Sequence, residues 1–105
     1  MVYFYAWETV DITITLDREN ALVDCDDVVV SIGQIGSRVL HKSDELDIDE
    51  NSNTIIMHLE QRETGKFVEG EANVQVNLYY SNGERDTSSK AVIYVRDNLY
   101  REAMS

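Results

Sequence analysis

Apolar and polar side chains alternate at every second position along most of this chain. In residues 10–16 the even positions are Val, Ile, Ile and Leu, while the odd positions are Asp, Thr and Thr. A period of two is typical of a strand that buries one face and exposes the other. The pattern therefore predicts a series of short strands. Similar alternation occurs in residues 28–32, 46–49, 54–60, 74–80 and 91–95.

The strongest turn signal is the dipeptide Asn82-Gly83, which follows the alternating residues 73–80. Asn-Gly readily supplies the two positive φ angles of a type I′ turn, so we expect a hairpin with a two-residue loop. With that loop, the apolar sets of the two strands face the same side of the sheet. The expected register pairs Ser81 with Glu84, Leu78 with Thr87, and Val74 with Ala91.

The spacing of these segments predicts the fold class. About seven short strands, with no long helical period between them, predict an all-β fold, an antiparallel immunoglobulin-like β-sandwich. A chain of 105 residues can bury one core, so we expect a single domain over residues 1–105. Residues 97–104 fit a short helical turn, an extra strand or a frayed tail, and we favour the helical turn.

The N-terminal residues are apolar on both faces of a would-be strand. Such a strand lies either inside its own domain or under a partner. We favour packing within the domain and keep an interface arm as the alternative. The odd positions are Tyr3, Tyr5 and Trp7, and the even positions are Val2, Phe4 and Ala6.

Charge narrows the range of partners. The chain has 20 acidic and 9 basic side chains, a net charge of -11, so it repels polyanions at long range. We therefore expect neither nucleic acid nor a membrane as a partner. Cys25 is the only cysteine, which excludes an intramolecular disulfide and fits a reducing compartment. The N-terminus lacks the basic region of a signal peptide.

One acidic segment partly matches a calcium-binding loop. Its oxygen-bearing side chains have the spacing of the first four ligand positions, but Ser52 replaces the required glycine and His58 replaces the bidentate glutamate. We favour an Asx-rich turn beside a charged strand face, and whether this loop binds a cation stays open. The four matching residues are Asp47, Asp49, Asn51 and Asn53.

No combination of residues in the sequence indicates catalysis. His41 and His58 have no partner at metal-ligand spacing, and aspartates flank Cys25, which disfavours its thiolate. A nucleophile elbow and a phosphate-binding loop are both missing. We therefore predict no enzymatic activity, no catalytic residue, no cofactor and no metal ligand. The residues we expect at an interface are Tyr3, Tyr5, Trp7, Tyr79 and Asn82.

A set of turn and core motifs spans nearly the whole chain. It resembles the small β-sandwich proteins encoded in prophages and phages of Gram-positive bacteria, a family of virion components. The motifs are the run from His41 to Ile48, Thr54-Ile55-Ile56, Leu59-Glu60-Gln61, Glu63-Thr64-Gly65-Lys66-Phe67 with Gly70, Val74-Gln75-Val76-Asn77-Leu78, Asn82-Gly83 with Arg85 and Ser88, and Val95 with Asn98-Leu99.

The resemblance implies a structural or assembly protein of the virion, in its head or tail region. Its partners would be copies of itself and other virion proteins, bound by strand edges and aromatic patches. It would be made in the bacterial cytoplasm and then reside in the virion. The alternative is a monomeric module that binds a peptide or carbohydrate through loops around residues 79–84.

Overall fold

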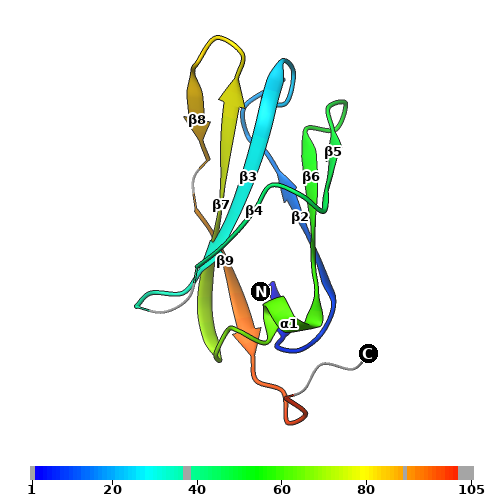
Figure 1. The fold of residues 1–105 in the computed structure, drawn as a ribbon, viewed down its shortest axis with the longest axis vertical. Coiled ribbons are helices and arrows are strands. Elements are labelled where there is room, and N and C mark those ends of the chain that lie inside the picture. The colour runs from blue at the N-terminus through cyan, green and yellow to red at the C-terminus, as the bar shows by residue number, and fades with distance from the viewer. Residues whose placement is uncertain (1, 37–38, 89, 102–105) are drawn as a thin grey trace.

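The structure, a computed structural model, describes residues 2–36, 39–88 and 90–101. Its strands form two sheets that pack face to face, so the expected all-β sandwich is confirmed (Figure 1). In chain order the elements are β1 (Tyr3–Tyr5), β2 (Val10–Thr15), β3 (Cys25–Gly33), β4 (Val39–Lys42), β5 (Leu46–Asp49), β6 (Thr54–Leu59), α1 (Gln61–Thr64), β7 (Gly70–Tyr80), β8 (Arg85–Thr87) and β9 (Ala91–Arg96).

The larger sheet has the strand order β1-β9-β7-β3-β4, with β8 also paired to β7, and the smaller sheet has the order β2-β6-β5. Strand pairs are antiparallel apart from β1 and β9, which run parallel with Phe4 opposite Val95. The chain turns sharply after β1, at Trp7 with a φ of 68°, so β1 joins the larger sheet and β2 joins the smaller. Alternation does not reveal which strands become neighbours, so the wholly antiparallel expectation missed this pair.

The core lies between the two sheets and is made from the predicted inward positions. Removing such side chains from water contributes about 1.5–3 kcal/mol for each large aliphatic residue. The alternation in β3, β6 and β7 therefore assigned the buried faces correctly. The buried residues of these three strands are Val28, Val30, Ile32, Ile55, Met57, Leu59, Ala72, Val74, Val76 and Leu78.

The hairpin between β7 and β8 has a longer loop than expected. Leu78 lies opposite Asp86 rather than Thr87, and the Tyr80 amide donates to the Glu84 carbonyl oxygen at 3.0 Å. Of the Asn-Gly dipeptide only Gly83 has a positive φ, 85°, whereas a type I′ turn needs two. The loop therefore has three residues, 81–83, and the register shifts by one. Pairing between β7 and β9 keeps the expected register, with Val74 opposite Ala91 and Ala72 opposite Ile93.

The C-terminal segment is not helical over residues 97–101, so the expected helical turn is wrong there; residues 102–104 lie outside the described part. The Asp97 side chain accepts a hydrogen bond from the Asn98 amide, and the Asn98 side chain accepts one from the Tyr100 amide. Such local bonds compete with helix formation. The described residues contain no helix long and apolar enough to span a membrane.

Candidate functional site

Three of the five predicted interface residues lie on the outer face of the larger sheet. Tyr3 and Tyr5 project from β1, with their rings edge to face at 5.9 Å, and the Arg96 guanidinium lies 4.6 Å from the Tyr3 ring centre. Tyr79 lies on the same face but at the opposite end of the sheet, where Arg85 stacks on its ring at 5.5 Å. The sheet therefore carries exposed tyrosines near both ends.

The other two predicted interface residues, Trp7 and Asn82, make contacts within the chain. Trp7 is half-buried, and its ring packs so closely on Gly65 that a Cβ at that position would overlap it. Asn82 sits at the hairpin tip, where its side-chain oxygen accepts a hydrogen bond from the Glu84 amide at 2.9 Å. Trp7 therefore joins the N-terminal segment to the chain after α1, and Asn82 shapes its own turn.

Between the tyrosines, three rows of outward-facing residues contain no Asp, Glu, Lys or Arg. We call these rows the neutral face. The rows follow directly from the pairing of β4, β3, β7, β8 and β9. They are Val39, Gly33, Asn73 and Val92 in the first row, His41, Ser31 and Gln75 in the second, and Val29, Asn77 and Thr87 in the third.

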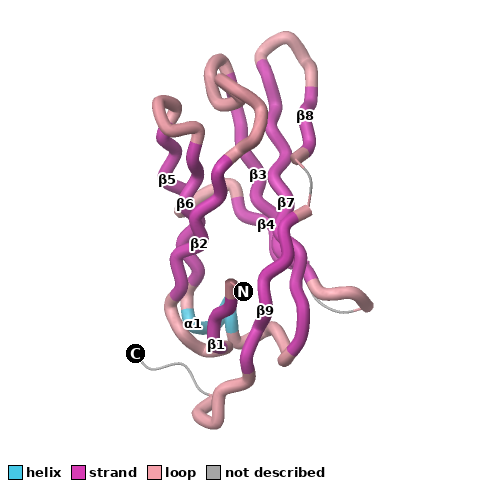
Figure 2. The backbone as a smooth tube through the Cα atoms, turned by 180° about the vertical axis from the view of Figure 1, so that it is seen from behind, coloured by secondary structure: helices cyan, strands magenta, loops and turns pink. Residues whose placement is uncertain are grey.

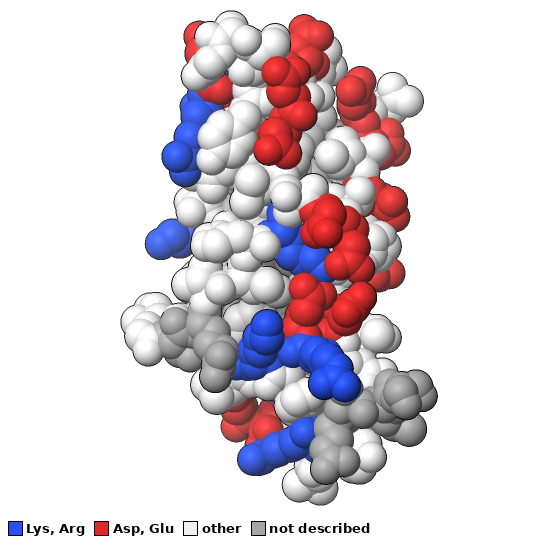
Figure 3. All heavy atoms as spheres, in the orientation of Figure 1, with Lys and Arg blue, Asp and Glu red and all other residues white. Residues whose placement is uncertain are grey.

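A depression of about 230 Å³ lies on the neutral face between Asn73, Gln75 and the rim residues Ile35 and Lys90. Ile35 is 95% exposed and Val39 is 58% exposed, so apolar surface projects at one side of it. Figure 3 shows that acidic side chains gather over the opposite side of the molecule, where β5 and β6 lie, and at the strand ends. Apart from Lys90 at its edge, the neutral face is therefore an uncharged area on a strongly acidic chain.

His41 and Ser31 form the one pair on this face that resembles catalytic machinery. The Ser31 hydroxyl and the His41 Nδ1 are 2.6 Å apart. A serine nucleophile also needs a group that orients its base and donors that stabilise an oxyanion. In the described part of the chain no carboxylate bonds to His41, and the pair lies open on a flat sheet. Its geometry fits a cross-strand contact.

The outer face of the smaller sheet has a different character. His58 on β6 bonds to Asp11 on β2 through Nδ1 at 2.6 Å and to Asp47 on β5 through Nε2 at 2.7 Å. The hydrogen bonds of the His58 ring to the carboxylate of Asp11, and then to that of Asp47, raise the pKa of His58. This histidine links all three strands of the smaller sheet.

The acidic segment that partly matches a calcium loop has its polar groups engaged elsewhere. Asp47 bonds to His58, and Asp49 accepts hydrogen bonds from the amides of Asn51 and Ser52 at 3.0 and 3.4 Å. The Asn53 amide group instead donates to two carbonyl oxygens after β2. Among the described residues no group of three or more His, Cys, Asp or Glu side chains could hold a metal ion. The segment has the Asx turn that we expected there.

Lys42 is a buried charged residue that our sequence reasoning missed. Its Nζ donates to Glu45 Oε1, Glu63 Oε1 and the His58 carbonyl oxygen, each at 2.8 Å. Burial alone would lower the pKa of Lys42, but the hydrogen bonds to Glu45 and Glu63 raise it above its usual value. Lys42 shares the inward parity of Leu40 on β4, a signal that could have revealed it.

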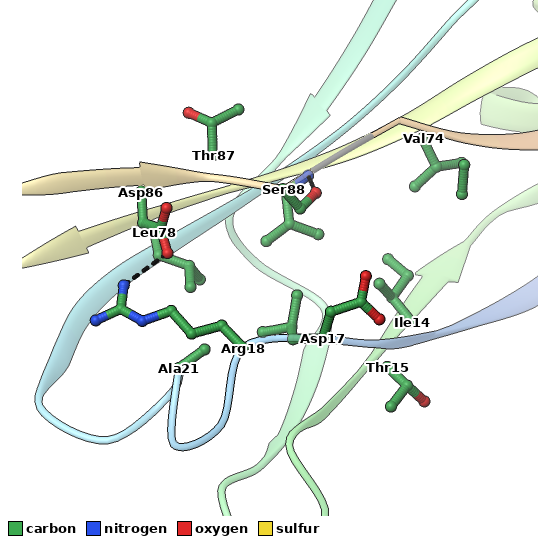
Figure 4. A pocket seen from close by; sticks show the side chains of 13 residues that line it. Ile14, Thr15, Asp17, Arg18, Ala21, Val74, Leu78, Asp86, Thr87 and Ser88 are labelled. Carbon is green, nitrogen blue, oxygen red and sulfur yellow. Dashed lines mark hydrogen bonds and ion pairs between the residues drawn. The ribbon is translucent and has the colours of Figure 1, made fainter.

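A cleft of about 420 Å³ lies between β2 and the strands β7 to β9. Figure 2 shows this side of the sandwich, with β2 and β9 in front. In Figure 4, Arg18 reaches across to Asp86 at 2.7 Å, while Ile14, Val74 and Leu78 point into the space between the sheets. Nothing in the local sequence signals this cleft, because it depends on how the two sheets are placed.

Comparison with known proteins adds information on the fold only. No family model and no curated protein matches the sequence. A crystal structure of a "putative glycoside hydrolase" from Bacteroides vulgatus is similar over 95% of this chain, with a TM-score of 0.55 and 11% sequence identity. The chain spans 17% of the length of that protein. The likeness supports the β-sandwich fold and assigns no residue a role.

Proposed function

We propose that this chain is a non-enzymatic assembly protein that docks through the neutral face of its larger sheet. The observation that carries the proposal is the absence of charged residues from three consecutive rows of that sheet, on a chain with a net charge of -11. Protein interfaces are depleted of charge at their centre and enriched in tyrosine. The exposed Tyr3, Tyr5 and Tyr79 flank the neutral face in this way.

A second copy of the chain is the partner that the charges favour. Two acidic molecules repel each other wherever their acidic surfaces meet, so contact is least costly where neither surface is charged. The ten residues of the three rows cover about 300 Å² per molecule from standard sheet spacings. A pair of such faces buries less than a stable dimer needs, so we expect weak association that an ordered assembly reinforces.

The virion role implied by the family resemblance fits this proposal. A small module with a weak self-docking face assembles only where many copies are held at high local concentration, as in a virion. The alternative is a monomeric module that binds a peptide through the loops around residues 79–84, and the cleft beside β2 does not support it, because those loops do not line the cleft. A carbohydrate ligand stays a prediction.

Self-association tests the proposal directly. We expect sedimentation velocity at millimolar protein to show reversible dimers, which strengthen with added salt because salt screens the repulsion. Val39→Glu places a charge on the neutral face and should weaken association at least tenfold. Thr13→Glu adds the same charge to the outer face of the smaller sheet and should change little. A strict monomer at all concentrations, or equal effects of both variants, would contradict the proposal.

A further inference from the structure

We propose that the cleft binds an extended peptide of a partner protein, which adds as a strand to β2 and inserts aliphatic side chains between the sheets. This inference goes beyond the proposed function. It concerns the opposite surface of the larger sheet and a different kind of contact, main-chain pairing rather than face-to-face docking.

The first observation is that β2 is an edge strand with free backbone groups. The Leu16 amide donates to the Asn53 carbonyl oxygen at 3.0 Å, so the even residues of β2 point their backbone groups toward β6. The odd residues, Thr13 and Thr15, therefore direct their N–H and C=O groups to the open side. Among the described residues no strand pairs with that side of β2. An open edge of this kind is a template for another strand.

The second observation is that the space beside this edge opens onto core residues. The floor of the cleft is apolar, formed by Val74, Val76 and Leu78 of the larger sheet. Ile14 and Leu16 form the wall beside β2, so apolar side chains from both sheets line part of the space. In a closed sandwich these inner faces would meet or be covered by another strand.

The larger sheet also has an unpaired strand edge beside the cleft, among the described residues. Strand β8 pairs with β7 alone, and pairing to β7 is interrupted before β9 begins at Ala91. Ala91 shares the inward parity of Ile93 but is exposed, because nothing in the described chain covers it. The cleft therefore lies between two strand edges, β2 and β8, and Ala91 lies at its rim.

The size of the cleft fits a peptide better than a folded surface. Its volume of about 420 Å³ is at the small end of ligand sites, which suits two or three aliphatic side chains. An extended chain rises about 3.3 Å per residue, so residues two apart point to the same side about 7 Å apart. A segment of roughly five residues would pair along β2 and place alternate side chains in the cleft.

The charges around the cleft indicate which residues a bound peptide should have at its ends. Asp17 lies beside the cleft, and Asp86 lies across it with Arg18 as its partner. The chain as a whole is strongly acidic, which attracts basic segments. The structure therefore favours a segment with Val, Ile or Leu at alternate positions and Lys or Arg at its ends.

A synthetic peptide can test this inference. The probe is a fluorescein-labelled, end-blocked peptide of sequence Lys-Val-Ser-Val-Ser-Val-Lys, and the control peptide replaces each Val by Gly. We expect the probe to raise fluorescence anisotropy saturably on titration with the protein, and the control to bind at least tenfold more weakly. Amide exchange measured by NMR should slow at Thr13 and Thr15 when the probe is bound. No binding at millimolar protein, or binding without protection of these amides, would overturn the inference.

Three variants locate the site. Ala91→Leu occupies part of the cleft and should weaken probe binding at least tenfold, while Val92→Leu, one residue along on the outer face, should leave it unchanged. Thr13→Pro removes an N–H that points to the open edge of β2 and that no β2–β6 bond uses, so it should also weaken probe binding. This variant tests the site if Ala91→Leu fails to fold. Equal binding by the folded variants would count against the cleft.

The two proposals can fail separately. Val39→Glu alters the neutral face and should leave probe binding unchanged, whereas Ala91→Leu should leave self-association unchanged. If the probe instead binds through the neutral face, Val39→Glu will weaken its binding and the cleft inference is wrong. If dimerisation depends on Ala91, a second copy occupies the cleft, and a partner peptide is not its occupant.

Discussion

The two lateral sides of this sandwich differ in how the sheets are joined. On the β4 side the Lys42 Nζ, from the larger sheet, reaches the His58 carbonyl oxygen of the smaller sheet and the carboxylates of Glu45 and Glu63. On the β2 side the Arg18–Asp86 pair crosses the cleft, with side chains 64% and 39% exposed. A buried pair is costly to break, whereas an exposed pair contributes little. The first side therefore holds the fold closed, and the second leaves room for a ligand.

The largest difference in stability should come from truncating one leucine in the closed core and one leucine at the cleft. Leu59→Ala, in the core away from the cleft, should lower the free energy of unfolding by about 4 kcal/mol because it leaves a closed cavity. Leu78→Ala, at the cleft floor, should cost only about 2 kcal/mol because the lost volume opens into existing space. Urea denaturation measures both values. Equal losses would mean that the cleft is closed in solution.

Removing the buried lysine should come next in size. Lys42→Met leaves Glu63 and the His58 carbonyl oxygen without their cationic partner, and should cost about 3 kcal/mol. Lys90→Met changes the same charge at an exposed site and should stay within about 0.5 kcal/mol of the parent. A loss at Lys42 as small as the one at Lys90 would show that the closed side depends on packing instead.

Filling part of the cleft should change the free energy of unfolding by a smaller amount, and should raise it rather than lower it. Ala91→Leu adds apolar atoms beside Val74 at the rim of the cleft, and should raise the free energy of unfolding by about 1 kcal/mol. Val92→Leu, whose side chain faces solvent on the other surface, is the matched control and should change stability little. Thermal unfolding distinguishes them. A destabilised Ala91→Leu variant would indicate that the cleft is too narrow for an added side chain.

The strands and their buried faces could be predicted from sequence because alternation is a local property. The β7–β8 register was missed by one residue, because the dipeptide Asn82-Gly83 fits two loops and only the structure shows that Gly83 alone has a positive φ. Tyr3, Tyr5 and Tyr79 were predicted as contact residues. Alternation placed Tyr3 and Tyr5 on one face of their strand, but nothing in the sequence indicated that Tyr79 shares that face of the sheet. The cleft and the parallel β1–β9 pair depend on which distant segments become neighbours, and no local pattern encodes that.

The smallest expected effect concerns His58, which ties the open edge β2 to the opposite edge β5 through β6. Its pKa is raised in the folded state, so its contribution to stability is complete below the unfolded pKa of about 6.5 and is lost as pH rises through the folded value. The stability difference between the parent and His58→Gln should therefore be larger at pH 6 than at pH 9. His41→Gln removes an imidazole that bonds to a hydroxyl and serves as the control. A difference that does not change with pH would mean that His58 holds β2 without its charge, and that acidification does not tighten the edge where the peptide is proposed to bind.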